Sequence, residues 1–167
     1  MHDKLTESDI EKIKKEIEYR KLTVRPDAIQ AVKEARAQGD LSENFEYYAA
    51  KKEKNANESR IRYLENMLKT AQVIESDSSF DEVGMNNTVT LFNERTQREM
   101  KVRIVTTIRT NPLKGLISID SPIGVAIYRH KVGERREVTL DNGETYFVEI
   151  RAIENTDDDS EDKISQY

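Results

Sequence analysis

The spacing of apolar side chains changes once along this chain, from a helical period to a strand period. In residues 5–38, apolar positions recur every three or four residues, which predicts helix. Pro26 interrupts this run, and it either kinks the helix or opens a second helix at its first position. A second helical run is predicted over residues 43–73, and the short link between the runs requires an antiparallel hairpin. Phe45 and Tyr48 are expected to pack this hairpin near its turn.

Residues 77–85 follow neither period and are predicted to be a linker. After the linker, alternating and β-branched stretches predict strands over residues 88–92, 100–108, 115–119, 137–140 and 146–153. The run Asp141-Asn142-Gly143 separates the last two strands and predicts a hairpin with a type I′ turn. Ser121 and Pro122 open a short predicted helix, with the serine as its cap and the proline at its first position.

These elements predict an α+β protein with two domains. The first, residues 1–76, is an antiparallel coiled-coil helical hairpin with its turn near residues 39–44. The second, residues 86–153, is a small and mostly antiparallel sheet domain with one short helix. Residues 154–167 carry the whole excess of negative charge behind the net −5, and they are predicted to be a disordered acidic tail. The tail is either a solubilising end or a competitor of nucleic acid for a basic surface.

Composition excludes several classes of site. The chain has no cysteine, so neither a disulfide framework nor a thiolate metal site is available. Its two histidines, His2 and His130, are far apart in sequence, which argues against a zinc site and against a Ser-His-Asp triad. No stretch approaches 18 apolar residues and no signal-type run opens the chain. We therefore expect a soluble cytoplasmic protein, without membrane association and monomeric when free.

The turn between the helical runs carries the most informative residues. Residues 39–44 read Gly-Asp-Leu-Ser-Glu-Asn, which places the carboxylates of Asp40 and Glu43 three residues apart. One interpretation is a capping box, in which Asp40 accepts a hydrogen bond from the Glu43 amide and Glu43 reaches back to the amide of Asp40. The other is a pair of solvent-facing acids that bind a metal ion, which is the rarer use of such a pair. The spacing alone does not distinguish the two.

Two separate motifs resemble a known family. Residues 35–51, Ala-Arg-Ala-Gln-Gly-Asp-Leu-Ser-Glu-Asn-Phe-Glu-Tyr-Tyr-Ala-Ala-Lys, closely resemble the tip motif of the bacterial Gre transcript-cleavage factors, the GreA/GreB family. Residues 119–124, Ile-Asp-Ser-Pro-Ile-Gly, followed by Lys-Val-Gly-Glu at 131–134, resemble the FKBP-like C-terminal domain of that family. The resemblance covers residues 10–153.

The resemblance implies an accessory factor of RNA polymerase rather than a nuclease in its own right. The family's hairpin enters the polymerase secondary channel and stimulates the polymerase to cleave the RNA 3′ end of backtracked complexes. By position, Asp40 and Glu43 are the tip acids that help hold a second Mg²⁺ there. Arg36 and Lys51 match basic residues that contact the RNA. Residues 120–123, namely Asp120, Ser121, Pro122 and Ile123, match the segment that docks onto the polymerase rim.

Two features depart from the family pattern. Residues 8–12, Ser-Asp-Ile-Glu-Lys, lack the Gly-Tyr pair expected at the start of the first helix, and the acidic tail is an addition. Both leave room for a specialised relative. The alternative function is therefore a regulator that occupies the secondary channel without stimulating cleavage, whereas a coiled-coil adaptor unrelated to transcription would leave the C-terminal motif unexplained.

Overall fold

The computed structural model describes residues 3–39, 44–75, 81–156 and 159–165. Its contacts divide the chain into two compact units. One is the helical hairpin, residues 10–72, and the other is the sheet domain, residues 73–167 together with Lys4–Asp9. None of the helices in these described stretches combines the length and the apolar character needed to cross a membrane.

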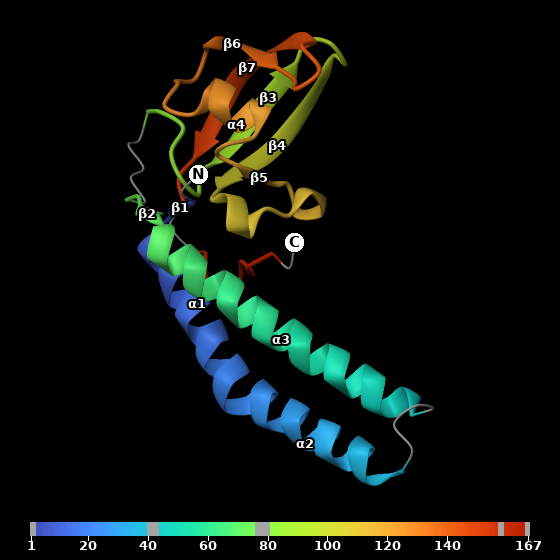
Figure 1. Ribbon diagram of the computed structural model, residues 1–167. Coiled ribbons are helices and arrows are strands. Elements are labelled where there is room, and N and C mark those ends of the chain that lie inside the picture. Colours follow the sequence, from blue (N-terminus) through green and yellow to red (C-terminus); the bar gives the residue numbers. More distant parts are fainter. Residues whose placement is uncertain (1–2, 40–43, 76–80, 157–158, 166–167) are drawn as a thin grey trace. The chain divides into compact units, whose positions relative to one another are not determined.

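The hairpin has one broken arm and one continuous arm (Figure 1). The first arm consists of α1 (Glu7–Tyr19), a π-helical turn η1 (Arg20–Val24) and α2 (Arg25–Ala37). The second arm is α3 (Phe45–Thr70), which packs against α2. Pro26 lies in the first turn of α2, and the wide turn η1 immediately precedes it. This placement suits proline, which lacks the amide hydrogen that a helix interior uses.

The two arms are joined by different chemistry along their length. Near the ends of the arms away from the turn, the hairpin buries apolar side chains, including Ile13, Ile61 and Leu64. Nearer the turn, the Arg25 guanidinium donates two hydrogen bonds to the Glu58 carboxylate, at 2.7 and 2.9 Å. An ion pair that is about a third exposed therefore joins the two arms in the part of the hairpin nearer the turn.

The sheet domain is built on five strands in the order β5-β4-β3-β7-β6. The strands are β3 (Thr88–Asn93), β4 (Arg98–Val105), β5 (Leu116–Ser118), β6 (Arg135–Thr139) and β7 (Thr145–Glu154). All neighbouring pairs are antiparallel except β4 with β5, which is parallel. Two single turns of 3-10 helix, η2 (Thr107–Arg109) and η3 (Pro112–Lys114), connect that pair, and α4 (Pro122–Ile127) packs on β6. The predicted fold class is confirmed.

The sheet domain begins earlier than its predicted first residue. Val83 and Met85, which the sequence assigns to the linker, are fully buried in the core with Val89, Leu91 and Ile104. The amide of Val83 donates to the carbonyl of His130 at 2.8 Å, and residues 76–80 lie outside the described residues. Two apolar residues, Val83 and Met85, are too short a run to show a strand or helix period, so the sequence did not predict that they belong to the core.

The β6-β7 hairpin exists as predicted, but its turn type is wrong. A type I′ turn needs positive φ at two successive residues, whereas only Gly143 adopts it, at 86°. The Gly143 amide donates to the carbonyl of Leu140, and the Leu140 amide donates to the carbonyl of Glu144. The loop is therefore one residue longer than a two-residue turn, with glycine in its left-handed position.

The N-terminal segment supplies an element that the sequence reading missed. The short strands β1 (Lys4–Leu5) and β2 (Gln72–Val73) pair with each other. A capping box then starts α1. The Thr6 amide donates to the Asp9 carboxylate at 3.0 Å, and the Asp9 amide donates to the Thr6 hydroxyl at 3.2 Å.

Candidate functional site

The turn of the hairpin is closed by one asparagine. Asn44 is the N-cap of α3, and its side-chain oxygen accepts a hydrogen bond from the Tyr47 amide at 3.0 Å. The side-chain nitrogen of Asn44 donates to the carbonyl of Ala35 at 2.6 Å, in the last turn of α2. On the other side of the turn, α2 ends at Ala37, and Gly39 has a φ of 124° that favours glycine. A single amide group thus caps one arm and ties it to the other.

This cap changes the interpretation of the tip acids. Asp40 and Glu43 lie outside the described residues, but the cap position of α3 is taken by Asn44 and the helix starts at Phe45. The N-cap of α3 is therefore Asn44, and the capping box considered for Asp40 and Glu43 falls outside the described residues. The helix has its cap without either acid.

Both basic residues predicted at the tip are exposed. Arg36 lies in the last turn of α2 and Lys51 lies on α3. A guanidinium nitrogen of Arg36 donates to the Tyr47 hydroxyl at 3.5 Å, and the guanidinium carbon lies 5.6 Å from the centre of the Tyr47 ring. This hydrogen bond, together with the charges of Lys51, Arg36 and Lys54, lowers the pKa of Tyr47 from its ordinary value. The described part of the tip is therefore electropositive around this phenol.

The aromatic side chains at the tip differ from expectation. Phe45 and Tyr48 were expected to pack the hairpin, yet their side chains are 86% and 52% exposed. The partly buried aromatic residue is Tyr47, whose ring meets Tyr48 edge to face at 5.5 Å between ring centres. Phe45 is the first residue of α3, where its ring is largely exposed to solvent.

The second predicted segment, residues 120–123, begins α4 of the sheet domain. Ser121 caps this helix by accepting from the Gly124 amide at 3.1 Å, and its hydroxyl donates to the Ser118 carbonyl at 2.6 Å. Pro122 occupies the first turn, as predicted. A Cβ on Gly124 would lie 2.2 Å from the Ser118 carbonyl oxygen, so only glycine fits this close approach.

The four residues of this segment serve two purposes. Ile123 packs against the core and Ser121 caps the helix, so both maintain the fold. Asp120 is exposed and, with Pro122, lines a cavity of about 250 Å³. The wall of that cavity also includes Val125, Ala126, Glu137, Thr139 and Asp141. The wall therefore combines three carboxylates, those of Asp120, Glu137 and Asp141, with the apolar side chain of Val125, which is 64% exposed.

Sequence reasoning missed the two tip residues that carry most of the described contacts, Asn44 and Tyr47. Asn44 was detectable, because asparagine directly before a helical run is a common N-cap. Tyr47 was not, because a phenol that packs on an arginine of the opposite arm leaves no periodic signal.

The chain matches the sequence models of two consecutive domains. The model described as transcription elongation factor, N-terminal, matches residues 4–73, and the model described as transcription elongation factor, GreA/GreB, C-term, matches residues 77–155. Together they span most of the 167 residues.

Curated relatives agree with these matches. Transcription elongation factor GreA of Caldanaerobacter subterraneus is 43% identical over 140 residues, which cover 83% of this chain and 89% of the relative. Transcription elongation factor GreA of Mesoplasma florum is 41% identical over 152 residues, which cover 89% of this chain and 96% of the relative.

Among solved structures, the GreA factor homolog 1 protein of Thermus thermophilus is 26% identical, with a TM-score of 0.42. The match covers 93% of this chain and all of that one. The family models and the curated relatives, rather than this likeness, carry the assignment. This chain belongs to the GreA/GreB family of transcription elongation factors.

Proposed function

We propose that this protein binds RNA polymerase through the secondary channel and stimulates the polymerase to cleave the RNA 3′ end in backtracked complexes. The observation that carries the proposal is the Asn44 cap. Because Asn44 caps α3 and ties it to Ala35, the hairpin does not need Asp40 or Glu43 for that role. Since Asn44 supplies the cap, the two acids at this turn are best explained by binding a metal ion together with a partner protein.

The chemistry of the tip requires that partner. Mg²⁺ takes six oxygens in near-octahedral geometry, so the two carboxylates of Asp40 and Glu43 cannot hold it well alone. Carboxylates of the polymerase and an RNA phosphate supply the remaining ligands in this proposal. Asp40 and Glu43 would hold one side of the shared ion, which would supply Lewis-acid activation of a water and charge stabilisation at the leaving oxygen. The protein by itself is then an accessory factor without nuclease activity.

Arg36 and Lys51 position the RNA in this scheme. Both are exposed at the tip, and their natural ligands are phosphate oxygens. The contact of Arg36 with the Tyr47 hydroxyl is long, at 3.5 Å, so the guanidinium can exchange it for a phosphate at little cost. The exposed rings of Phe45 and Tyr48 offer faces on which RNA bases can stack.

The sheet domain holds the factor on the polymerase rim. Asp120 and Pro122 line the exposed cavity beside Val125, and Glu137 and Asp141 make its margin acidic. A surface of this kind fits a partner segment with basic side chains around an apolar one. Ser121 and Ile123 contribute by fixing the start of α4. The protein acts in the cytoplasm, as a monomer when free.

The test is RNA cleavage in a purified backtracked complex with Mg²⁺. The wild type is compared with the double variant Asp40→Asn, Glu43→Gln, which removes both negative charges and leaves Asn44 in place. We expect the wild type to stimulate cleavage and the variant to lose at least 100-fold of that stimulation, in line with the loss of a metal-positioning group. The variant should bind the polymerase as the wild type does.

A matched control removes the same charge from the same hairpin. The variant Glu46→Gln, Glu53→Gln also loses two carboxylates, both exposed on α3. Its cleavage stimulation should stay within a few-fold of the wild type. Binding by the wild type without stimulated cleavage would instead identify a regulator that occupies the channel.

A further inference from the structure

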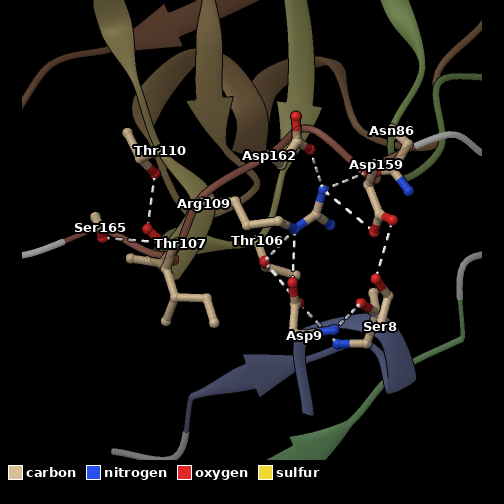
Figure 2. Close-up of polar contacts among 12 residues, drawn as sticks. Ser8, Asp9, Asn86, Thr106, Thr107, Arg109, Thr110, Asp159, Asp162 and Ser165 are labelled. Carbon is tan, nitrogen blue, oxygen red and sulfur yellow. Dashed lines mark hydrogen bonds and ion pairs between the residues drawn. The ribbon is translucent and has the colours of Figure 1, made fainter. Parts of the chain in front are cut away.

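The described part of the acidic tail is bound to the sheet domain, which differs from the expected disorder. Figure 2 shows the contacts of Asp159 and Asp162 with Ser8 and Arg109. The carboxylate of Asp162 accepts from Arg103 at 2.9 Å with one oxygen and from Arg109 at 2.8 Å with the other. Asp159 accepts from the Ser8 hydroxyl at 2.9 Å and forms a longer ion pair with Arg109, at 3.7 Å. Further along, Ser165 donates to the Ile108 carbonyl from its amide at 2.6 Å and from its hydroxyl at 2.9 Å.

Arg109 is the buried centre of the contacts that the tail makes. Arg109 is completely buried, and among the groups outside the tail its carboxylate partner is Asp9, whose oxygen lies 2.6 Å from the guanidinium. Arg109 also donates to the Asn86 side-chain oxygen at 2.8 Å, and Arg103 donates to the Asn86 carbonyl at 3.3 Å, so Asn86 and Asp162 both join the two guanidiniums. Burying a guanidinium is costly unless carboxylates pair with it. Asp162 supplies one such carboxylate, and its own side chain is only 7% exposed.

The receiving surface is made for a peptide rather than for any polyanion. The Ile108 carbonyl accepts two hydrogen bonds from the tail, and a DNA backbone has acceptors but no hydrogen-bond donor to meet it. The tail itself turns so that the Asp162 amide donates to the Asp159 carbonyl at 3.0 Å, which presents both carboxylates on one side. The geometry therefore matches acids three residues apart followed by an amide donor three residues later.

A cavity continues from this surface. Its volume is about 570 Å³, and it is lined on the domain side by Lys101, Arg103 and Lys114 and on the tail side by Asp162 and Ser165. The lysines extend the positive surface beyond the contacts that the tail makes.

We propose that Arg103, Arg109, Ser8 and the Ile108 carbonyl form a binding site for acidic peptide segments of the pattern Asp-x-x-Asp-x-x-Ser, and that the chain's own tail is its intramolecular ligand. This site is separate from the tip and from the Asp120 surface, so it goes beyond the proposed function. A protein segment with the same spacing of acids competes with the tail for it. Because the tail is tethered to the domain, its effective concentration at the site is in the millimolar range, and a competing segment has to displace it.

The first experiment tests occupation by the tail in the full chain. Hydrogen exchange of the Ser165 amide is compared in the wild type, in Asp162→Asn and in Glu161→Gln. The Glu161 side chain is exposed, so Glu161→Gln removes the same charge from the same tail without touching the contacts to Arg103 and Arg109. We expect Asp162→Asn to speed exchange at Ser165 at least tenfold and Glu161→Gln to leave it within twofold. Equal rates in all three proteins would overturn the proposal.

The second experiment tests the site with a separate peptide. In the full chain with Asp159→Asn and Asp162→Asn, the tail no longer competes, and a fluorescent peptide of residues 155–167 is added. We expect saturable binding, at least tenfold weaker for the peptide with Asp162→Asn and for the protein with Arg103→Gln added. Binding that does not depend on Asp162 or Arg103 would overturn the site. So would failure of the peptide to bind, because the tail would then be a purely structural strap. Displacement by a single-stranded DNA oligonucleotide as readily as by unlabelled peptide would show a general polyanion surface instead.

Discussion

Asn44 performs two jobs at the tip, and they can be separated by substitution. Asn44→Ala removes the cap of α3 and one of two hydrogen bonds to the Ala35 carbonyl, which also accepts from the Gln38 amide, so the hairpin should lose about 1–2 kcal/mol of stability. Asn44→Ser keeps a capping oxygen and loses only the donor to Ala35, so its loss should be smaller. Urea unfolding followed by helical circular dichroism checks both. Phe45→Ala, beside it but 86% exposed, should stay within about 0.5 kcal/mol of the wild type, and a larger loss would show that Phe45 packs.

The ionisation of Tyr47 reports the position of Arg36. The hydrogen bond from Arg36 is the main cause that lowers the pKa of Tyr47, so Arg36→Gln should raise that pKa toward its ordinary value of 10.0. An NMR titration of the tyrosine ring carbons follows this phenol separately from the other six. Lys52→Gln, an exposed lysine on the same helix, serves as the control and should leave the pKa unchanged. An unchanged pKa in Arg36→Gln would mean that the contact does not persist in solution.

At the residue scale, the sequence reading succeeded where one residue type has one dominant use. Ser121 and Pro122 at the start of α4 are such a case, since the serine cap and the N-terminal proline were both predicted and both occur. At the tip, Asp40 and Asn44 are equally good caps by residue type. What distinguishes Asn44 is its hydrogen bond to the carbonyl of Ala35 on the opposite arm, and a local sequence pattern does not contain that contact.

At the element scale, the outer hairpin depends on the Arg25–Glu58 ion pair, which is sensitive to acid. Arg25 lowers the pKa of Glu58 below its ordinary value of 4.5. Because the folded-state pKa is the lower one, the stabilisation is present above the unfolded pKa and is lost as the pH falls through the folded value. Glu58→Gln should therefore cost up to about 1 kcal/mol at pH 7, since both side chains are about a third exposed, and progressively less below pH 4.5.

Urea unfolding of the hairpin between pH 3 and pH 7 measures this difference. Glu53→Gln, an exposed glutamate on the same helix, is the control and should show little difference from the wild type at any pH. A Glu58→Gln loss that stays constant down to pH 3 would contradict the ion-pair explanation.

The positions of helices and strands followed from the sequence because each element has a long periodic face. The α3 helix lies within its predicted run, and the strands β3, β4, β6 and β7 overlap theirs, with ends shifted by up to three residues. The parallel pairing of β5 with β4 did not follow, because alternation sets which face a side chain takes and not the direction of the neighbouring strand. The predicted turn type at Gly143 was wrong for a related reason. The sequence shows where the glycine is, but the loop length depends on the pairing of Leu140 with Glu144.

At the scale of the whole molecule, the division of the chain into units could not be predicted from local pattern. Lys4–Asp9 belongs to the sheet domain although it precedes the first hairpin arm. The reason is a charge buried within that domain, since Asp9 is fully buried against Arg109 and Thr106. The same arginine receives Asp162 from the tail. The two departures from the family pattern, in the N-terminal segment and in the tail, therefore meet at one guanidinium.

Arg109 links these two segments, so their contributions to stability should not add. Asp9→Asn leaves a buried cation short of a carboxylate and should destabilise the sheet domain by about 3 kcal/mol. Asp162→Asn should cost less, because its second partner, Arg103, is partly exposed and can turn to water. In the double variant, both carboxylates of one guanidinium are lost, and the combined loss should exceed the sum of the single losses by about 1 kcal/mol. Native-state hydrogen exchange at the Val89 and Ile104 amides, in the central strands, measures this coupling. Strict additivity would mean that the N-terminal segment and the tail are held independently, and that Arg109 does not join them.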